Sequence, residues 1–428
     1  MIIIDILFFI LYELTCCACL LLAKREFRSQ ISITSIFTLP YLCICTIQEI
    51  FCIAFDFFDI PVAEYWLINI VFIVLTFFTE VLLSKIVHNK CSINNSNFER
   101  RDSTKITSFF HLSIAAIILY AIINSILSVS NIDISMLLQD EFQDDFGESA
   151  GGNFYIRLVT IILAVYLLGF GRTKMEYFFG ALCFIPHLIV NTKGVLFIPI
   201  IATIIIRVLS GRLKNLKKTF FLIGIFGTII FFFSYLLENI IYSEEIDSDR
   251  LLFLCEKMIV YVLAGVQEFS VNVRDHIVHN EMLDNITMAP IINLFSKFGV
   301  GESISNVNKE IFRTIGHLPH YGIANSNVNG YIGTLYIFNG FLGALFYHVV
   351  LIVITFCLKL KCNNHRPFWS VLYALYLSGF FLGWFEFYFM HTFWVYFILL
   401  IIIFDIFYKY CNKKRGKKPV GGIKKSVL

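Results

Sequence analysis

The chain has 428 residues, of which 58% are hydrophobic and 15% are charged, against roughly 45–50% and about 25% in soluble domains. A soluble domain of this size could not bury so much apolar surface, so a soluble enzyme, a disordered chain and a nucleic-acid-binding domain are excluded. The formal net charge of +3 says little alone, because the charges are strongly sorted along the chain. The composition predicts an integral membrane protein.

Apolar runs of about 20 residues, the length that crosses a bilayer as a helix, predict eleven membrane spans. They lie near residues 2–23, 31–54, 65–86, 106–130, 154–171, 176–191, 194–206, 219–237, 329–358, 367–385 and 391–408. The first eight belong to an N-terminal part, 1–237, and the last three to 329–408. Residues 176–206 are short for two full spans, so two short helices and a re-entrant pair both remain open.

The basic residues predict how these spans are oriented. Lys and Arg are enriched in cytoplasmic loops, and with an external N-terminus 26 of the 34 Lys and Arg fall on the cytoplasmic side. Eight fall outside, and the C-terminal residues 409–428 form a basic cytoplasmic tail. One miscounted span would place several basic loops on the wrong side, so the charge pattern favours this topology.

Two external loops differ from the rest. The first, near 131–153, is acidic and ends in Gly151-Gly152. The second covers 238–328 and is long enough to form a small subdomain outside the membrane. Its segment 251–273 is apolar enough to predict a helix that lies in the membrane interface.

Arginines on this external side are candidate phosphate ligands, because the planar guanidinium suits bidentate phosphate binding. Arg250, Arg274 and Arg313 lie in the large loop, and Arg157 lies at the outer end of the fifth span, where a charge is costly. Ion pairs with acidic loop residues and snorkelling of Arg157 to the interface are the structural alternatives.

The segment 313–330 is dense in polar groups directly before a long apolar span. Histidine exchanges protons near neutral pH, and asparagine can orient sugar hydroxyls. Its candidate residues are His317, His320, Tyr321, Asn325, Asn327 and Asn329. We expect this segment to contribute to a site at the outer membrane surface.

Ionisable residues inside the spans mark further positions of interest. They include Glu49, Glu80 and His187, while Glu386 and His391 flank the outer end of the last hairpin of spans. Glu49 and Glu80 lie near span ends, where snorkelling can explain them. No nucleotide-binding or zinc-protease motif occurs, and we expect neither a cofactor nor a metal.

At this level the chain resembles bacterial Wzy-type O-antigen polymerases, which join oligosaccharide repeat units. The resemblance lies in the eleven-span layout, the large loop before the last three spans and the run Asn325–Leu345. The stretches Asn191-Thr-Lys-Gly194 and Tyr261-Val-Leu-Ala-Gly265 are also similar to that family. It implies an all-α, polytopic membrane protein with a large periplasmic loop and a GT-C-like polymerase or ligase architecture.

The resemblance implies glycosyl transfer on the periplasmic face of the bacterial inner membrane. The substrate would be an oligosaccharide on undecaprenyl pyrophosphate, and a chain-length regulator is a possible partner besides membrane lipids. The catalytic candidates are then Arg274, Arg313, His317 and His320, with a loop carboxylate as another general base. Substrate would contact Arg157, Arg250, Tyr321, Asn325, Asn327 and Asn329.

The sequence departs from the family at one motif. Some members carry an Arg followed by Gly after ten intervening residues, whereas here Arg313 is followed by Gly316 and Gly322. Two other functions stay open: a ligase that transfers finished glycan to another acceptor, and a flippase for lipid-linked oligosaccharides. The missing internal repeat and the external position of the polar groups favour an enzyme over a transporter.

Overall fold

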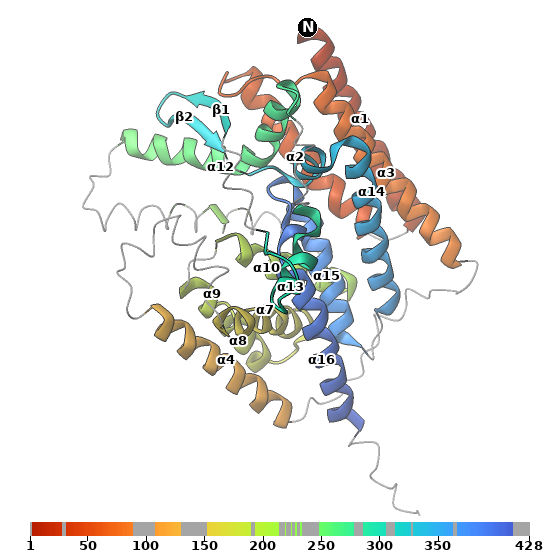
Figure 1. Cartoon of the computed structure of the whole chain (residues 1–428), viewed down its shortest axis with the longest axis vertical. Helices are drawn as coiled ribbons and strands as arrows, with labels where there is room; N and C mark the ends of the chain where they lie inside the picture. Colours follow the sequence, from red (N-terminus) through yellow and green to blue (C-terminus); the bar gives the residue numbers. More distant parts are fainter. Residues whose placement is uncertain are drawn as a thin grey trace, which may run out of the picture.

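The computed structural model of the chain is predominantly α-helical (Figure 1). It describes residues 2–27, 31–88, 108–129, 152–189, 193–213, 248–277, 286–304, 313–326, 328–362 and 366–413, with five isolated positions between 219 and 232. Several predicted features lie outside these residues: most of the span 219–237, nearly all of the acidic loop 131–153, Asn327 and the tail from 414 onward.

The helices follow the apolar runs of the sequence. In the N-terminal half they are α1 (Ile2–Phe27), α2 (Ile33–Ile53), α3 (Ala63–His88), α4 (Ser108–Val129), α7 (Gly152–Phe170), α8 (Lys174–Leu182), α9 (Ile185–Ile189) and α10 (Lys193–Leu209). In the C-terminal half they are α12 (Ser248–Arg274), α13 (Ala289–Ser296), α14 (Tyr331–Lys361), α15 (Pro367–Phe381) and α16 (Phe393–Lys413), with short 3-10 turns η2 (Ile286–Met288), η4 (Leu382–Trp384) and η5 (Tyr388–Met390).

Five helices within the described part of the chain are long and apolar enough to cross a membrane: α1, α2, α3, α14 and α16. Shorter apolar stretches lie in α4, α7 and α10. The chain is therefore an α-helical membrane protein, as its composition predicts. The run 176–206, which the sequence left open, consists of the three helical pieces α8, α9 and α10.

The large loop has more structure than its sequence predicts. The interfacial helix expected over 251–273 is α12, and the polar segment that follows forms a β-hairpin, β1 (Arg313–Leu318) and β2 (Gly322–Ser326). The strands are antiparallel, with Arg313 opposite Ser326 and Leu318 opposite Gly322. Gly322 has a φ of +79° at the turn, which glycine adopts without strain.

Within the described residues the fold is all-α as predicted, apart from this short hairpin. Its inward side chains are Ile315 and Leu318 of β1 and Ala324 and Ser326 of β2. The spacing of two in β2 is that of a half-buried strand, and in β1 the spacing is three, where the register shifts between Thr314 and Gly316. The polar and glycine-rich composition of 313–330 hides it in the sequence.

One end of the molecule gathers the loop elements, and we call it the hairpin end. It contains the β-hairpin, the α2–α3 connection 54–62, and the α15–α16 connection 382–392. The backbone joins the first two, because the His317 N–H donates to the Phe57 carbonyl at 3.0 Å. In Figure 1 the N-terminus lies toward this end, whereas α16 ends at the opposite one.

Helix α12 is fastened to the hairpin end by close backbone contacts. A Cβ on Gly265 would lie 2.1 Å from the Phe385 carbonyl oxygen, so only glycine allows this approach. The Gly265 carbonyl also accepts the Gly330 N–H at 3.0 Å, which ties α12 to the start of α14. Gly265 therefore holds three distant segments together.

Candidate functional site

A buried polar cluster lies where α12 meets α2 and α14 at the hairpin end. We call it the α12 cluster, and it consists of Gln48, Gln267, Glu268, Asn272 and Asn329. Four of the five side chains are fully buried, and Asn329 is 5% exposed. Buried polar groups are costly unless they are hydrogen-bonded, so their bonding decides what the cluster can do.

Part of the cluster fixes α12 in place. The Gln48 amide donates to Gln267 at 2.7 Å, and the Gln267 amide donates to the Asp59 carbonyl at 3.1 Å. Tyr65 donates its hydroxyl to Gln48 at 3.0 Å. These bonds join α12 to α2, to α3 and to the connection between them.

The other part leaves acceptors unused. Asn329 donates to Glu268 Oε1 at 3.0 Å and accepts from the Asn272 amide at 2.9 Å. Within the described part of the chain, Glu268 Oε2 and Asn272 Oδ1 have no hydrogen-bond partner. Glu268 and Asn272 are one helical turn apart on the same face. They present two buried acceptors side by side, which suits a ligand that donates hydroxyl protons.

The carboxyl group of Glu268 titrates near neutrality. Burial raises its pKa from 4.5 to about 7, against the lowering effects of Ser326, the Val328 N–H, Asn329 and the charge of Arg313. A general base works best with a pKa near the ambient pH. Of the predicted residues, Arg313 and Asn329 thus come together here, around a glutamate that the sequence analysis did not single out.

The hairpin is held over α12 by a second glutamate. Glu256 accepts the backbone N–H groups of His320 at 2.8 Å and Tyr321 at 2.7 Å, and it contacts His320 Nδ1 at 2.9 Å. Burial alone would raise the pKa of Glu256, but these hydrogen bonds outweigh it and lower the pKa. His320 therefore has its ring oriented by a carboxylate at the hairpin turn.

The remaining hairpin candidates differ in exposure. The His317 side chain is exposed on β1, whereas Tyr321 and Asn325 are half-buried. Tyr321 lies against Phe253 with ring centres 5.3 Å apart, and Asn325 accepts the Thr314 hydroxyl across the strands at 2.9 Å. His317 is the histidine of this group whose side chain faces outward.

Of the three other predicted arginines, Arg274 lies beside the α12 cluster, two residues after Asn272 on the same helix. Arg250 and Arg274 are at opposite ends of the 27-residue α12, a separation that one pyrophosphate cannot bridge. Arg274 pairs with Asp59 and, at 3.1 Å, with Asp275, and all three side chains are well exposed. Arg157 is buried in α7, and its carbonyl accepts the hydroxyl of Thr160, which also contacts His187 at 3.0 Å.

The acid and the histidine of the α15–α16 connection form a pair. Glu386 Oε1 lies 3.1 Å from His391 Nε2, and both side chains are less than a fifth exposed. Phe385, next to Glu386, stacks on Tyr261 of α12 with ring centres 5.2 Å apart. This pair therefore lies beside α12, near Gly265 and away from the hairpin turn.

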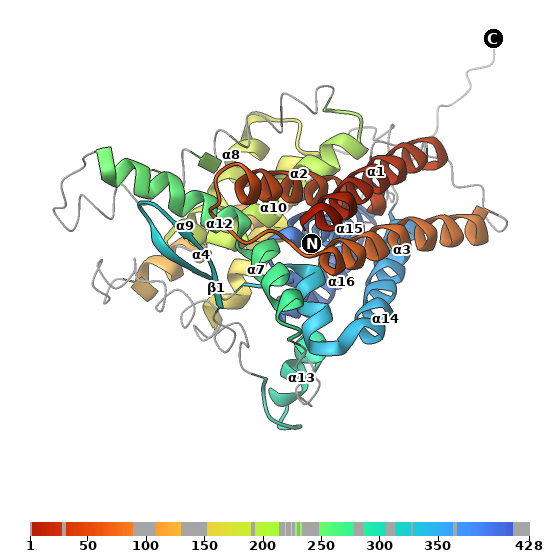
Figure 2. The ribbon, with the colours of Figure 1, turned by 90° about the horizontal axis from the view of Figure 1, so that it is seen from above.

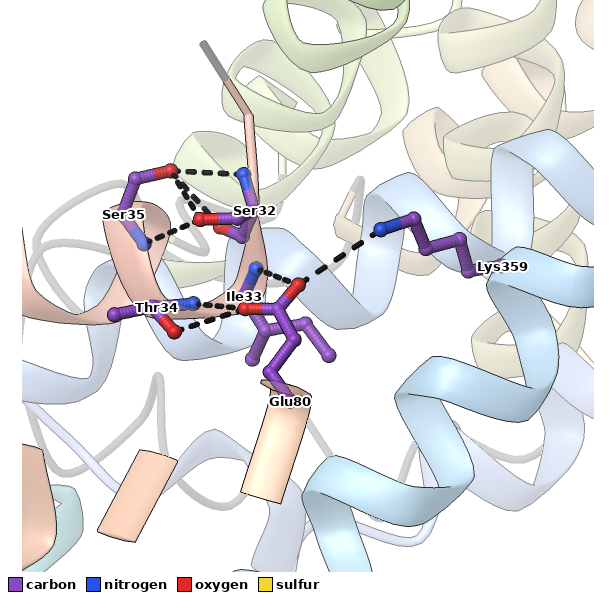
Figure 3. Close-up of polar contacts among 6 residues, drawn as sticks. All are labelled: Ser32, Ile33, Thr34, Ser35, Glu80 and Lys359. Carbon is purple, nitrogen blue, oxygen red and sulfur yellow. Dashed lines mark hydrogen bonds and ion pairs between the residues drawn. The ribbon is translucent and has the colours of Figure 1, made fainter. Parts of the chain in front are cut away.

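Glu80 has a structural role at the end of the molecule opposite the hairpin. Its carboxylate accepts the N–H groups of Ile33 at 3.1 Å and Thr34 at 2.9 Å and the Thr34 hydroxyl at 2.9 Å, as Figure 3 shows. Lys359 Nζ lies 3.8 Å away. Glu80 is fully buried and binds the first N–H groups of α2, where the helix dipole favours a negative charge. It does not snorkel.

A histidine that the sequence analysis passed over is buried among the spans. His348 of α14 contacts the Tyr331 hydroxyl through Nδ1 and the Thr76 hydroxyl through Nε2, both at 2.8 Å. Thr76 already donates to the Phe72 carbonyl, so His348 Nε2–H donates to Thr76 and Nδ1 accepts from Tyr331. The neutral ring thus fixes Tyr331, the first residue of α14.

One known protein family matches most of the chain. The sequence model of one family, described as a family of unknown function (DUF6337), matches residues 65–414. The chain belongs to this family. The matched part of this DUF6337 member runs from the start of α3 to the end of α16. It includes α12, the hairpin and the α15–α16 connection. No curated protein and no solved structure matches the chain.

The sequence contains a signal for Glu268 within the apolar segment 251–273. Its last turns read Gln267-Glu268-Phe-Ser270-Val-Asn272. Glu268 and Asn272 are spaced by four, so both lie on one helix face. An ionisable residue on the buried face of an apolar helix is a site candidate in its own right.

Proposed function

We propose that this DUF6337 member is a glycosyltransferase that polymerises undecaprenyl-pyrophosphate-linked oligosaccharide repeat units into O-antigen or a related surface polysaccharide. The observation that carries the proposal is the α12 cluster: a buried carboxyl with a pKa of about 7, hydrogen-bonded to Asn329 and within electrostatic reach of Arg313. The resemblance to Wzy-type polymerases supplies the reaction.

The proposed topology places this cluster where the reaction requires it. Eleven spans with an external N-terminus put the hairpin end on the periplasmic face of the bacterial inner membrane, and the sorting of Lys and Arg supports that orientation. Both substrates carry lipid tails, so the site must lie at the membrane surface. The α12 cluster lies next to the start of the spanning helix α14.

The proposed chemistry gives one role to Glu268 and one to Arg313. A hydroxyl of the acceptor repeat unit attacks the anomeric carbon of the growing chain, and Glu268 takes the hydroxyl proton. The bond between that carbon and the pyrophosphate breaks, and undecaprenyl pyrophosphate leaves with the bonding electrons. Arg313 stabilises the charge that develops on the pyrophosphate. Because the hairpin covers Glu268, it must lift from α12 when the acceptor binds.

Deletion of the gene tests the function directly. We expect the host to display surface glycan with single repeat units only, because assembly and export of the unit continue without polymerisation. Gel separation of the surface glycan measures this. A ladder of normal chain lengths would refute the proposal, and loss of attached glycan of every length would indicate the ligase reaction instead.

Alanine variants of two arginines test the charge assignment. Arg313→Ala is expected to lower polymer yield about 100-fold, the usual loss when a group that stabilises developing charge is removed. Arg274→Ala is the matched control, because its charge is already paired with Asp59 and Asp275 at the surface, where ion pairs contribute little. Polymer yield per inserted protein is the measurement. Equal yields in both variants would exclude Arg313 from the site.

A further inference from the structure

An exposed apolar surface lies outside the predicted spans, on α13 and the turn that follows it. Four large side chains there are exposed: Ile291 by 43%, Phe295 by 52%, Phe298 by 77% and Val300 by 62%. Ile291 and Phe295 are one helical turn apart on the outer face of α13, and Phe298 and Val300 follow in the turn after the helix; we call these four residues the stripe. Contiguous exposed apolar surface of this kind marks a contact with a membrane or another protein.

The stripe is held outward by the local structure. Asn293 accepts the Ile304 N–H at 2.7 Å and donates to the Ile304 carbonyl at 3.2 Å, which closes the segment 293–304 into a loop. Gly299 and Gly301, both with φ near +79°, make its turns. Leu294 packs inward on the core. The exposed phenylalanines therefore belong to a closed, hydrogen-bonded loop whose opposite face is anchored.

The position of the segment points to lipid. Helix α13 packs against α16, one of the long apolar helices, and against η5. Figure 2 shows it standing out from the rim of the molecule, and in Figure 1 it lies well below the β-hairpin. The neighbouring helix α14 also exposes apolar residues, Leu342 by 79% and Phe346 by 65%.

A lysine beside the stripe has the surroundings typical of a membrane interface. Lys297 Nζ donates to the Tyr155 hydroxyl at 3.0 Å and lies 5.2 Å from the ring centres of both Tyr155 and Tyr396. Tyrosines collect at the headgroup level, and lysines there keep their charge in the polar layer. Lys297, Tyr155 and Tyr396 therefore indicate how deep the segment lies in the membrane. Lys297 lies at the level of the headgroups, and the stripe lies on the acyl-chain side of it.

We propose that residues 289–301 insert into the leaflet at the hairpin end of the molecule as an interfacial element, with Phe295, Phe298 and Val300 among the acyl chains. The occupant of this face is lipid and not a second copy of the chain. The exposed stripe, its hydrogen-bonded closure and its continuity with the spanning helices support this insertion independently of the proposed glycosyl transfer.

Site-specific photocrosslinking in vesicles of phosphatidylethanolamine and phosphatidylglycerol tests the proposal. The photoreactive residue p-benzoylphenylalanine replaces Phe298 or Phe295 in two separate variants of the full chain. Leu342, 79% exposed on α14, is the lipid-facing reference. Ile323, 63% exposed on β2, is the matched control outside the bilayer. Mass spectrometry of the irradiated protein counts lipid adducts.

We expect adducts at Phe298 and Phe295 within about twofold of Leu342 and at least tenfold above Ile323. Adducts at Leu342 without adducts at either phenylalanine would overturn the proposal. A crosslinked dimer of the chain formed through Phe298 would overturn it as well, because it would identify the stripe as an interface between copies.

Discussion

Glycan polymerisation is expected to fall at least 100-fold when Glu268 is replaced by glutamine. General-base catalysis contributes about 10²–10⁴ to a rate, and glutamine cannot take the acceptor proton. The substitution keeps the shape of the side chain and an oxygen that accepts the Asn329 amide. Polymer yield per inserted protein measures the effect. Glu302→Gln, at an exposed carboxylate on the same side, is the control and should retain full activity.

The same substitution should stabilise the protein at alkaline pH, which separates a catalytic role from a structural one. Burial raises the pKa of Glu268 from 4.5 to about 7, so folding favours its protonated form. The charged form then costs about 3 kcal/mol of folding free energy. This cost is absent below pH 4.5, grows between pH 4.5 and 7, and is complete above pH 7.

Thermal unfolding of wild type and Glu268→Gln at pH 5 and pH 8.5 measures this cost. The variant should gain stability over the wild type only at the higher pH, while its activity is lost at both. A variant that is less stable at both pH values would make Glu268 a structural residue, and any loss of activity would then reflect misfolding.

A large loss of stability is expected when Glu80 is replaced by alanine. The carboxylate accepts three hydrogen bonds from Ile33 and Thr34 at the buried start of α2. Its removal leaves two backbone N–H groups and a hydroxyl without acceptors, each of which costs about 1–3 kcal/mol when buried. The free energy of unfolding should therefore fall by roughly 3 kcal/mol or more.

Lys359→Met provides the matched comparison for Glu80. The lysine is a third exposed and its Nζ is 3.8 Å from the carboxylate, so its loss should cost under about 1 kcal/mol. Thermal unfolding in detergent compares the two variants. If Lys359→Met destabilises the protein more than Glu80→Ala does, the main contribution of Glu80 to stability is its ion pair with Lys359. Its hydrogen bonds to the start of α2 would then be secondary.

The membrane character and most helices of this fold could be predicted because their signals are local. An apolar run such as 65–86, which forms α3, is helical wherever it lies in lipid, since only internal hydrogen bonds satisfy its backbone there. The helix α12 is likewise predicted from the apolar composition of 251–273.

The site itself depends on contacts between distant segments. Glu268 becomes buried only because Asn329 and the hairpin fold over it, and no property of residues 251–273 alone gives that arrangement. The polar density of 313–330 predicts a functional segment but does not reveal the β-hairpin that the segment forms. The ring of His320 is oriented by Glu256, 64 residues earlier in the chain, which the local sequence could not indicate.

The central claim is a glycosyl transfer at the α12 cluster, and reconstitution tests it most directly. Purified chain in lipid vesicles is supplied with the host's undecaprenyl-pyrophosphate-linked repeat unit, and the lipid-linked products are separated by length. We predict chains of two and more units, with one undecaprenyl pyrophosphate released per bond formed, and no such products from Glu268→Gln. Folded wild-type protein that leaves the repeat unit unextended, or a Glu268→Gln variant that extends it at the wild-type rate, would contradict the account.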